Sequence, residues 1–561
     1  MKKYLFSLFS LFVTTMLIGQ VAPNKYWVKF TDKNGSPYSI DDPAAFLTQR
    51  AIDRRTAHGI AIDESDIPVN QAYVDAVEAI GVTILNTSKW FNSVTIYTTN
   101  SSLINTINNL DFVESVEKGN SKPNMLNDKF YKPFFNNESY GKIPETGILK
   151  SSNSGLSYDY GDSFNQINML NGVALHDLGY DGEGMVIAVL DAGYLNVNDL
   201  PAFDNLWNNG QILGTRDFVA PHNPDIFNSH SHGCMVLSTM GGYLPGEIIG
   251  TAPQADYWLL RSEDGDSEYL IEELNWVSAA EFADSVGADV INSSLGYTTF
   301  DNPSQDHSYE DMDGNTTPIT IGADKAASKG MIVVNSAGNS GNDPWHYIGA
   351  PADGDSVFTI GAVNGNGEYA SFSSVGPTYD GQVKPNVVAQ GQGSTIVEPW
   401  GGTVTNGNGT SFSSPITAGM VACLWQAHPE KRNTEIMQAI QLSATQANTP
   451  DDLLGYGIPD YMLAHDIITN SGIEYSVDNS ISIFPNPFND EIFITSDIER
   501  KGPVNILLLD VAGKILHQVT LNNIVNGEEI LLSDLGKLKP GVYFTKINYD
   551  NYSSVKKIVK K

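Results

Sequence analysis

The sequence predicts an α/β protein with a central parallel sheet, preceded by a small α+β module and followed by a small β-sandwich. The run 185–190 is apolar throughout and lies between Gly184 and Gly193, which is typical of a parallel strand covered on both faces. Residues 24–118 alternate between strand-like and helix-like patterns. After residue 470, short strand-like runs are separated by Gly, Asn and Pro, which indicates a sandwich of about ninety residues.

The first 20 residues have the pattern of a secretory signal. Lys2 and Lys3 precede an apolar stretch from Leu5 to Ile18, and cleavage is expected near Gly19–Gln20. This stretch is too short for a membrane anchor, and no later segment reaches the length of a transmembrane helix. We therefore expect a mature protein that is soluble or held at the cell surface by other means.

Residues 21–119 are predicted to form the small α+β module. Asp42 and Pro43 are typical of a helix start, so we expect one helix from there through Arg55, another helix before the two middle strands, and a short amphipathic helix over 102–110. The expected strands are 26–30, 82–85, 93–97 and 113–116. The segment 120–160, rich in Asn, Lys, Pro and Ser at its start, is predicted to be an exposed connector open to proteolysis.

A serine lies at the start of an apolar helical run in 409–424. Ser411 follows Gly409 and Thr410, and we expect Pro415 to lie in the first turn of the helix, where a missing N–H costs nothing. The positive end of a helix stabilises negative charge that develops beside Ser411. The pattern is therefore typical of an acyl-transfer nucleophile.

Two residues upstream can activate such a serine. Asp191 ends the strand predicted over 185–190, at the carboxyl edge where open α/β sheets bind ligands. His232 lies where a polar loop becomes a helix of small and apolar residues. A histidine can take the serine proton and return it to the leaving amine, and an aspartate can orient the imidazole and stabilise its cation.

Each of these residues taken alone has an ordinary structural interpretation as a cap, turn or hydrogen-bonded core residue. His230 and His232 could also be metal ligands together with His222, although no cysteine or carboxylate cluster completes a site. Further blocks in the sequence favour catalysis instead: 250–253 (GTAP), 290–296 (VINSSLG), 336–339 (SAGN) and 370–377 (ASFSSVGP).

Together these blocks resemble the subtilisin-like serine peptidases, the subtilase family, over about residues 160–470. The order Asp191, His232, Ser411 is that of subtilisin. The residues at 232–235, where the predicted helix begins, depart from the family's usual His-Gly-Thr-His sequence, because Cys234 and Met235 occupy positions where Thr and His are common. Neither of these two positions carries a proton in the mechanism.

The resemblance implies a three-layer peptidase domain over 161–470 that needs no cofactor for its chemistry. It implies that Asn339 and the Ser411 backbone N–H form the oxyanion hole. It also implies that an extended peptide substrate pairs with backbone in the cleft. The residues expected to line that cleft are Ser293, Ser294, Leu295, Gly296, Ser336, Ala337 and Gly338. Gly349 is expected at the base of the first specificity pocket, leaving it roomy.

The module at 21–119 resembles a subtilase propeptide, which acts as folding chaperone and temporary inhibitor; a permanent accessory domain is the alternative. The C-terminal part, 471–561, opens with Pro-Asn-Pro at 485–487 and ends in a basic tail at 556–561. It resembles the C-terminal sorting domain of type IX secretion substrates, which implies export through the periplasm and across an outer membrane. The alternative is a substrate-binding sandwich.

Residues 151–470 contain 39 acidic and 7 basic side chains, so they account for nearly all of the chain's formal charge of −33. Such a surface repels nucleic acid and anionic lipid. It could also attract calcium, and 311–315 resembles a fragment of a calcium loop without the full ligand spacing. Cys234 and Cys423 are expected to be buried thiols, although a bridge between their helices stays open.

The sequence therefore predicts a secreted or surface-bound serine endopeptidase made as a precursor. We expect a monomer that acts on proteins or peptides and is recognised by the type IX machinery. Two alternatives remain. One is a catalytically silent adhesin on the same scaffold, which the intact set of Asp191, His232, Ser411 and Asn339 disfavours. The other is a sedolisin-like acid peptidase, which Asp191 and His232 disfavour.

Overall fold

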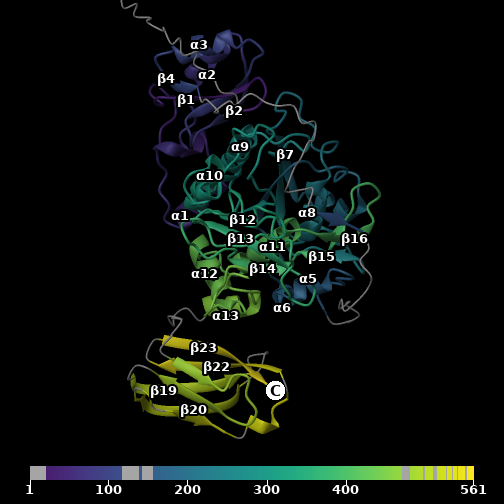
Figure 1. The fold of residues 1–561 in the computed structure, drawn as a ribbon, viewed down its shortest axis with the longest axis vertical. Helices are drawn as coiled ribbons and strands as arrows, with labels where there is room; N and C mark the ends of the chain where they lie inside the picture. The colour runs from purple at the N-terminus through teal and green to yellow at the C-terminus, as the bar shows by residue number, and fades with distance from the viewer. Residues whose placement is uncertain are drawn as a thin grey trace, which may run out of the picture. The chain divides into compact units, whose positions relative to one another are not determined.

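The computed structural model describes residues 21–116, 138–141, 156–469 and most of 481–561 (Figure 1). The predicted signal at 1–20 and most of the predicted connector at 120–160 lie outside the described residues. In the last part, the described residues are 481–496, 500–509, 515–525, 527, 529–533, 535–539, 541–549 and 552–561. The chain divides into two compact units, Met1–Tyr461 and Met462–Lys561.

The N-terminal module is an antiparallel sheet covered by two helices. The strands are β1 (Lys25–Phe30), β2 (Thr83–Ser88), β3 (Ser93–Tyr97) and β4 (Val113–Val116), in the order β2-β3-β1-β4. Val74 and Val77 of α2 (Gln71–Glu78) and Ile104 and Ile107 of α3 (Ser102–Asn108) are buried in one apolar core with Val28 of the sheet. The α+β composition of this module agrees with the sequence.

The predicted helix from Pro43 through Arg55 is wrong in its start. Asp42 makes no side-chain cap, and Pro43–Ala45 is only a 3-10 turn. The helix α1 runs from Gln49 to Ala57, because the Thr48 side chain accepts a hydrogen bond from Ala51 N and so satisfies a donor of the first turn.

A buried charge cluster joins α1 and the β2–β3 turn to the peptidase part of the chain. The Asp284 carboxylate on α9 (Ile271–Val286) accepts hydrogen bonds from Arg54 Nη2 at 2.8 Å, Arg55 Nη2 at 2.8 Å and Lys89 Nζ at 3.0 Å. Asp66 holds Arg55 bidentately at 2.9 and 3.0 Å. All five side chains are at most 9% exposed. Each charge is therefore paired inside the interface.

The central sheet has seven parallel strands in the order β14-β13-β12-β11-β6-β10-β7. The strands are β6 (Val186–Asp191), β7 (Ile212–Asp217), β10 (Asp256–Arg261), β11 (Val290–Ser293), β12 (Ile332–Ser336), β13 (Val357–Val363) and β14 (Val387–Gln390). Every residue of β6 is buried, as its unbroken apolar sequence predicts for a strand covered on both faces.

Helices cover the two faces of this sheet. Val186, Ala188 and Leu190 of β6 share a core with Trp276 of α9 and Ala323 of α10 (Pro318–Ser328). The intervening strand residues are equally buried, and α8 (His232–Gly241) and α11 (Thr410–Ala427) pack against them. The smaller helices of this unit are α5 (Phe164–Asn168), α6 (Gly172–Asp177), α7 (Asp204–Asn208) and α12 (Asn433–Ser443). The three-layer prediction is confirmed.

A small antiparallel sheet lies beside the start of α11. It consists of β15 (Gln392–Val397), β16 (Val404–Asn408) and the two-residue strand β5 (Ser139–Tyr140). A two-stranded sheet pairs β8 (Tyr243–Leu244) with β9 (Ile248–Ile249). The helix α13 spans Tyr461–Thr469.

The second unit contains two antiparallel sheets, as the sequence predicts. One has the order β17-β18-β21 (Ile481–Phe484, Ile492–Ser496 and Ile530–Leu532). The other has the order β20-β19-β22-β23 (Ile515–Ile524, Arg500–Leu509, Gly541–Tyr549 and Tyr552–Lys560). Ile494, Ile506 and Ile547 belong to one buried apolar cluster that both sheets share.

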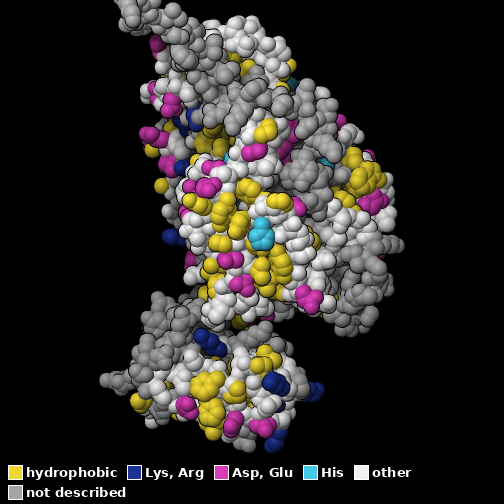
Figure 2. All heavy atoms as spheres, viewed as in Figure 1, with side chains coloured by type: hydrophobic (Ala, Val, Ile, Leu, Met, Phe, Trp, Pro, Cys, Tyr) yellow, Lys and Arg dark blue, Asp and Glu magenta, His cyan; other side chains and the backbone are white. Residues whose placement is uncertain are grey.

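Cys234 and Cys423 are both buried and neither forms a disulfide. Burial raises the pKa of both thiols, which keeps them protonated. Figure 2 shows acidic side chains scattered over the viewed face of the first unit, with few basic ones. In the described part of the chain, no helix is long and apolar enough to span a bilayer.

Candidate active site

Three strands deliver polar side chains to one edge of the central sheet. Asp191, Ser293 and Ser336 are the last residues of β6, β11 and β12, which are neighbours in the sheet. Because the strands are parallel, their carboxyl ends share an edge, and Asn339 follows β12 there. This is the position that the sequence predicts for Asp191 and Asn339.

Asp191 and His232 are in direct contact. His232 Nδ1 lies 2.8 Å from Asp191 Oδ1 and 3.0 Å from Oδ2, and both side chains are fully buried. His232 is the first residue of α8, and Gly233 allows the close approach, since a Cβ there would lie 2.4 Å from Gly193 O and 3.0 Å from Asp191 Cβ. Ala192 N also donates to Asp191 Oδ1 at 2.7 Å.

The other imidazole nitrogen faces a carboxylate that sequence reasoning missed. His232 Nε2 lies 3.3 Å from Oε1 of Glu138, whose side chain is also fully buried. Burial lowers the pKa of His232, but Asp191 and Glu138 outweigh it and raise the pKa to about 10. Burial raises the pKa of Asp191. No motif marks Glu138, because its contact joins residues that lie 94 positions apart in the sequence.

Ser411 is the second residue of α11 and is fully buried. Its Oγ has no hydrogen-bond partner among the described residues. The sequence placed Pro415 in the first turn, and this is wrong: Pro415 lies in the second turn and cannot donate to Ser411 O. Ser294 Oγ donates to that carbonyl instead, at 3.0 Å, so the missing backbone bond is replaced beside the candidate nucleophile.

Asn339 is oriented by Thr410. Its Oδ1 accepts hydrogen bonds from Thr410 N at 2.8 Å and Thr410 Oγ1 at 2.9 Å. Gly338 N donates to Thr410 Oγ1 at 3.2 Å, which ties the two segments together. Because Oδ1 of Asn339 accepts both bonds from Thr410, the N–H groups on Nδ2 lie at the opposite end of the same side-chain amide.

A narrow cavity of about 20 Å³ adjoins Asn339. Four of the seven predicted cleft residues line it: Gly296, Ser336, Ala337 and Gly338. Gly349 lines it as well, together with Thr298, Trp345 and Tyr347, which sequence reasoning missed. The expectation of a roomy pocket is not met, because these larger side chains narrow it.

The other three predicted cleft residues are buried near the carboxyl edge of the central sheet. Ser293 Oγ accepts from Trp276 Nε1 at 3.0 Å, and Leu295 packs in the core. Ser294 supports Ser411 as described. A contact of these residues with substrate stays a prediction.

The metal alternative for the histidines gains no support from the described residues. His222 Nε2 lies 2.6 Å from Ile84 O, and the imidazole ring centroids of His230 and His232 are 6.4 Å apart. Asp313, in the predicted calcium-loop fragment, accepts local bonds from Asn315 N and Thr316 Oγ1 at 2.9 Å each.

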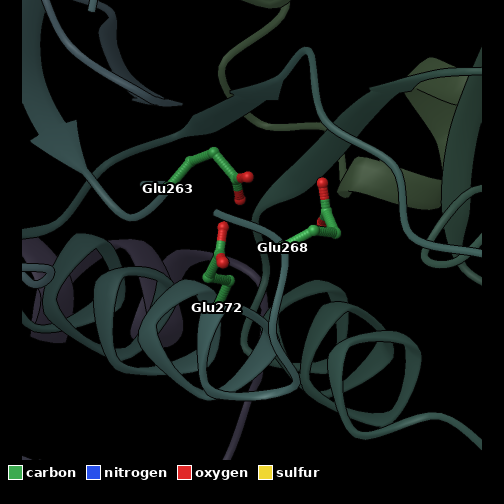
Figure 3. Close-up of side chains that lie close together, drawn as sticks. All are labelled: Glu263, Glu268 and Glu272. Carbon is green, nitrogen blue, oxygen red and sulfur yellow. The ribbon is translucent and has the colours of Figure 1, made fainter. Parts of the chain in front are cut away.

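A different acidic group brings three carboxylates close enough together to share a cation. Carboxylate oxygens of Glu263, Glu268 and Glu272 lie within 4.8 Å of one another, and all three residues are buried (Figure 3). They come from the loop after β10 and from the first turn of α9. Oxygen donors of this kind are those that calcium prefers.

Comparisons with known proteins match three parts of the chain to family models. Residues 25–132 match the peptidase S8 propeptide domain of Bacteroidota, residues 182–457 the subtilase family, and residues 482–561 the secretion system C-terminal sorting domain.

Two similar relatives are subtilisins. Subtilisin NAT of Bacillus subtilis subsp. natto is 30% identical over 331 residues, which cover 58% of this chain and 76% of the relative. The subtilisin of Bacillus pumilus is 30% identical over 284 residues, which cover 50% and 90%. Among solved structures, MycP1 from Mycobacterium smegmatis matches with a TM-score of 0.43 and 21% identity, over 58% of this chain and 89% of that one.

The match to subtilisin NAT, at 30% identity over 76% of that relative, and the family match over residues 182–457 assign the chain to one family. The parallel sheet and the sequence blocks described above agree with this assignment. The chain belongs to the subtilase family of serine endopeptidases and carries the family's propeptide and a secretion sorting domain.

Proposed function

We propose that this protein is a secreted precursor of a serine endopeptidase that cuts peptide bonds with Asp191, His232 and Ser411. The observation that carries the proposal is the buried Asp191–His232 pair at the sheet edge where α11 presents Ser411. His232 takes the Ser411 proton during attack and returns it to the leaving amine, and Asp191 stabilises the imidazolium. An acyl-enzyme then forms on Ser411 and is hydrolysed by water.

Asn339 is the proposed side-chain donor to the oxyanion. Thr410 holds the amide oxygen, which supports a role for the Nδ2 end as donor. The Ser411 N–H at the start of α11 is the second donor, in the field of the helix N-terminus. This reaction uses side chains, a backbone N–H and water, so no cofactor enters it. Structural calcium stays a prediction.

The narrow cavity supports a preference for short, uncharged side chains at the residue whose carbonyl is attacked. Its volume of about 20 Å³ holds roughly one water molecule. Its lining contains no charged side chain: Gly296, Thr298, Ser336, Ala337, Gly338, Asn339, Ser340, Trp345, Tyr347, Gly349 and Ser374. A charged substrate group there would lose its hydration without gaining a partner.

The C-terminal unit is the proposed signal for export across the outer membrane. Its match to a sorting domain supports recognition by a type IX secretion system, and the N-terminal signal supports passage across the inner membrane first. We expect the mature enzyme outside the cell or on its surface, as a monomer acting on proteins or peptides.

A fluorophosphonate probe tests the proposal. The processed wild type is expected to be labelled, and Ser411→Ala is expected to show no labelling and no hydrolysis of a protein substrate. Unlabelled wild type would favour the adhesin. Activity confined to acidic pH would favour a sedolisin-like enzyme. Cleavage profiling with a peptide library tests the pocket, since a preference for Lys, Arg or Glu at the attacked residue contradicts it.

A further inference from the structure

A cavity of about 260 Å³ lies between the N-terminal module and the peptidase part of the chain. Its polar lining consists of His58 from the module and of Ser328, Ser356, Arg432, Asn433 and Thr434 from the peptidase part. No carboxylate is among the described residues that line it. In a peptidase region with 39 acidic and only 7 basic side chains, this cavity is therefore locally basic. None of its lining residues belongs to the proposed triad or oxyanion hole.

The peptidase side of the cavity presents a cation and the positive end of a helix. Arg432 immediately precedes α12, and Asn433 Nδ2 fixes the start of this helix by donating to Ala327 O at 2.8 Å and to Met331 O at 2.9 Å. A Cβ on Gly59 would lie 3.8 Å from Arg432 Nη2, so the guanidinium reaches across to the module. A helix start and a guanidinium that meet in one cavity favour an oxyanion there.

The module side of the cavity supplies a polar atom that lacks a hydrogen bond. His58 is only 6% exposed, and its Nδ1 is buried without a hydrogen-bond partner among the described residues. The ring stands edge-on to Trp425, with 5.7 Å between centroids. Burial and the nearby Arg54 lower the pKa of His58, so the imidazole is neutral at neutral pH. A buried polar atom without a partner costs free energy, which a ligand that bonds to Nδ1 removes.

We propose that this cavity binds a phosphate group between Arg432 and the start of α12 on one side and His58 on the other. The oxyanion oxygens accept hydrogen bonds from the guanidinium and from N–H groups at the helix start. Hydrogen phosphate also carries a hydroxyl, so it can bond to Nδ1 in either tautomer of a neutral imidazole. The volume of the cavity leaves room for the ion together with several water molecules.

A phosphate in this cavity would connect two parts of the chain. His58 and Gly59 belong to the module, whereas Arg432 and Thr434 belong to the peptidase part. A ligand that contacts both parts binds more tightly when the module is docked, and by reciprocity it strengthens docking of the module. The site is thus a means by which phosphate favours retention of the module, and it does not depend on the proposed catalytic reaction.

The first experiment measures binding to the full-length chain. Ser411→Ala protein is titrated calorimetrically at neutral pH and constant ionic strength with inorganic phosphate, glycerol phosphate and acetate. One saturable phosphate site is expected, and the tighter of the two phosphate compounds shows whether the ligand is free phosphate or a monoester. No saturable binding of either compound, or acetate bound as tightly as both, would overturn the proposal.

Arg432→Gln tests the cation on the same protein. It is expected to weaken phosphate binding about tenfold, because a charge-assisted hydrogen bond is lost. Lys431→Gln is the matched control, since it makes the same charge change one residue earlier, outside the cavity lining and beside Glu435 at 3.7 Å. This control is expected to change the affinity by less than about twofold, as for an exposed charge. Equal losses in the two variants would mean that only diffuse charge attracts the anion.

His58 variants and hydrogen exchange test the connection between the two parts. His58→Phe keeps a ring beside Trp425 but lacks Nδ1, whereas His58→Asn places an amide near that position. We expect His58→Phe to lose phosphate affinity and His58→Asn to retain more of it, and equal losses would contradict the role of Nδ1. Phosphate is expected to slow amide exchange in both α1 and α12 of the Ser411→Ala protein. Protection confined to α12 would overturn the bridging role.

Discussion

Replacing Asp284 by alanine is expected to loosen the N-terminal module from the peptidase domain. The change removes the carboxylate that Arg54, Arg55 and Lys89 share inside the interface. Arg55 keeps Asp66, so Arg54 and Lys89 carry most of the loss. Breaking a buried ion pair costs about 3–5 kcal/mol, which corresponds to roughly 150- to 5,000-fold weaker binding.

The assay is inhibition of the mature enzyme by the cleaved module, recovered from the processed complex. Asp284 lies on α9, away from the sheet edge, so the activity of the mature variant without the module is expected to match wild type. Glu183→Ala, at an exposed loop position, is the control and is expected to leave the inhibition unchanged. Inhibition by the module within threefold of wild type in Asp284→Ala would refute the reasoning.

The charge cluster around Asp284 also determines whether binding of the module strengthens or weakens as the pH falls. Burial raises the pKa of Asp284, but the three cations outweigh it and hold the pKa below its usual range. A lowered carboxyl pKa contributes stability above the ordinary pKa of the free group, and this is lost as the pH falls through the lowered value. Binding of the module is therefore expected to be full at neutral pH and to weaken only in strong acid.

Four further predictions concern the site and export. Asn339→Ala is expected to lower kcat by roughly 100- to 1,000-fold with little change in KM, the effect known for an oxyanion donor in subtilisin; steady-state kinetics check this, and a change in KM alone would show a binding role. His232→Ala is expected to lose nearly all hydrolysis, whereas His230→Ala keeps most of it, since His230 lies before α8, where it accepts a bond from His232 N at 3.3 Å. Reversed losses in the same assay would mean that the base is misplaced. Glu138→Gln removes one of the two carboxylates that raise the pKa of His232, so the acid limb of fluorophosphonate labelling is expected to move to lower pH, and an unmoved limb would contradict the contact. Deleting 481–561 is expected to leave peptidase activity intact but to strand the enzyme in the periplasm of its native host; normal export, seen by cell fractionation, would make the C-terminal unit a binding module.

The sequence predicts those parts of the site that follow strand ends and helix starts. Asp191 is the last residue of an apolar run, and His232 and Ser411 lie at the starts of helices. Because parallel strands end at one edge, the end of an apolar run is enough to place Asp191 at that edge. The helix over 43–55 was misplaced, because a proline after an aspartate also starts a 3-10 turn and the effective cap was Thr48.

The contacts that the sequence does not predict join segments far apart in the chain. Ser294 replaces a backbone bond that Pro415 lacks, across 117 residues to Ser411, and Arg54 meets Asp284 across 230. Neither pair has a periodicity or a motif of its own. The narrow cavity is a similar case, since Trp345 and Tyr347 enter it from a loop whose path depends on tertiary packing.

Maturation of this chain is expected to need two separate steps, cleavage of the chain and release of the module. Cleavage between the module and the peptidase region would cut the covalent link, but it would leave Arg54, Arg55 and Lys89 on Asp284, because none of these contacts involves the predicted connector. The peptidase region has few cations of its own to replace them, with 7 basic against 39 acidic side chains over 151–470. The module places three cations on the buried Asp284, so the cut module is expected to stay bound until it is degraded or displaced. Processing at the bond and release of activity are therefore separate events that a time course of N-terminal sequence and labelling can resolve.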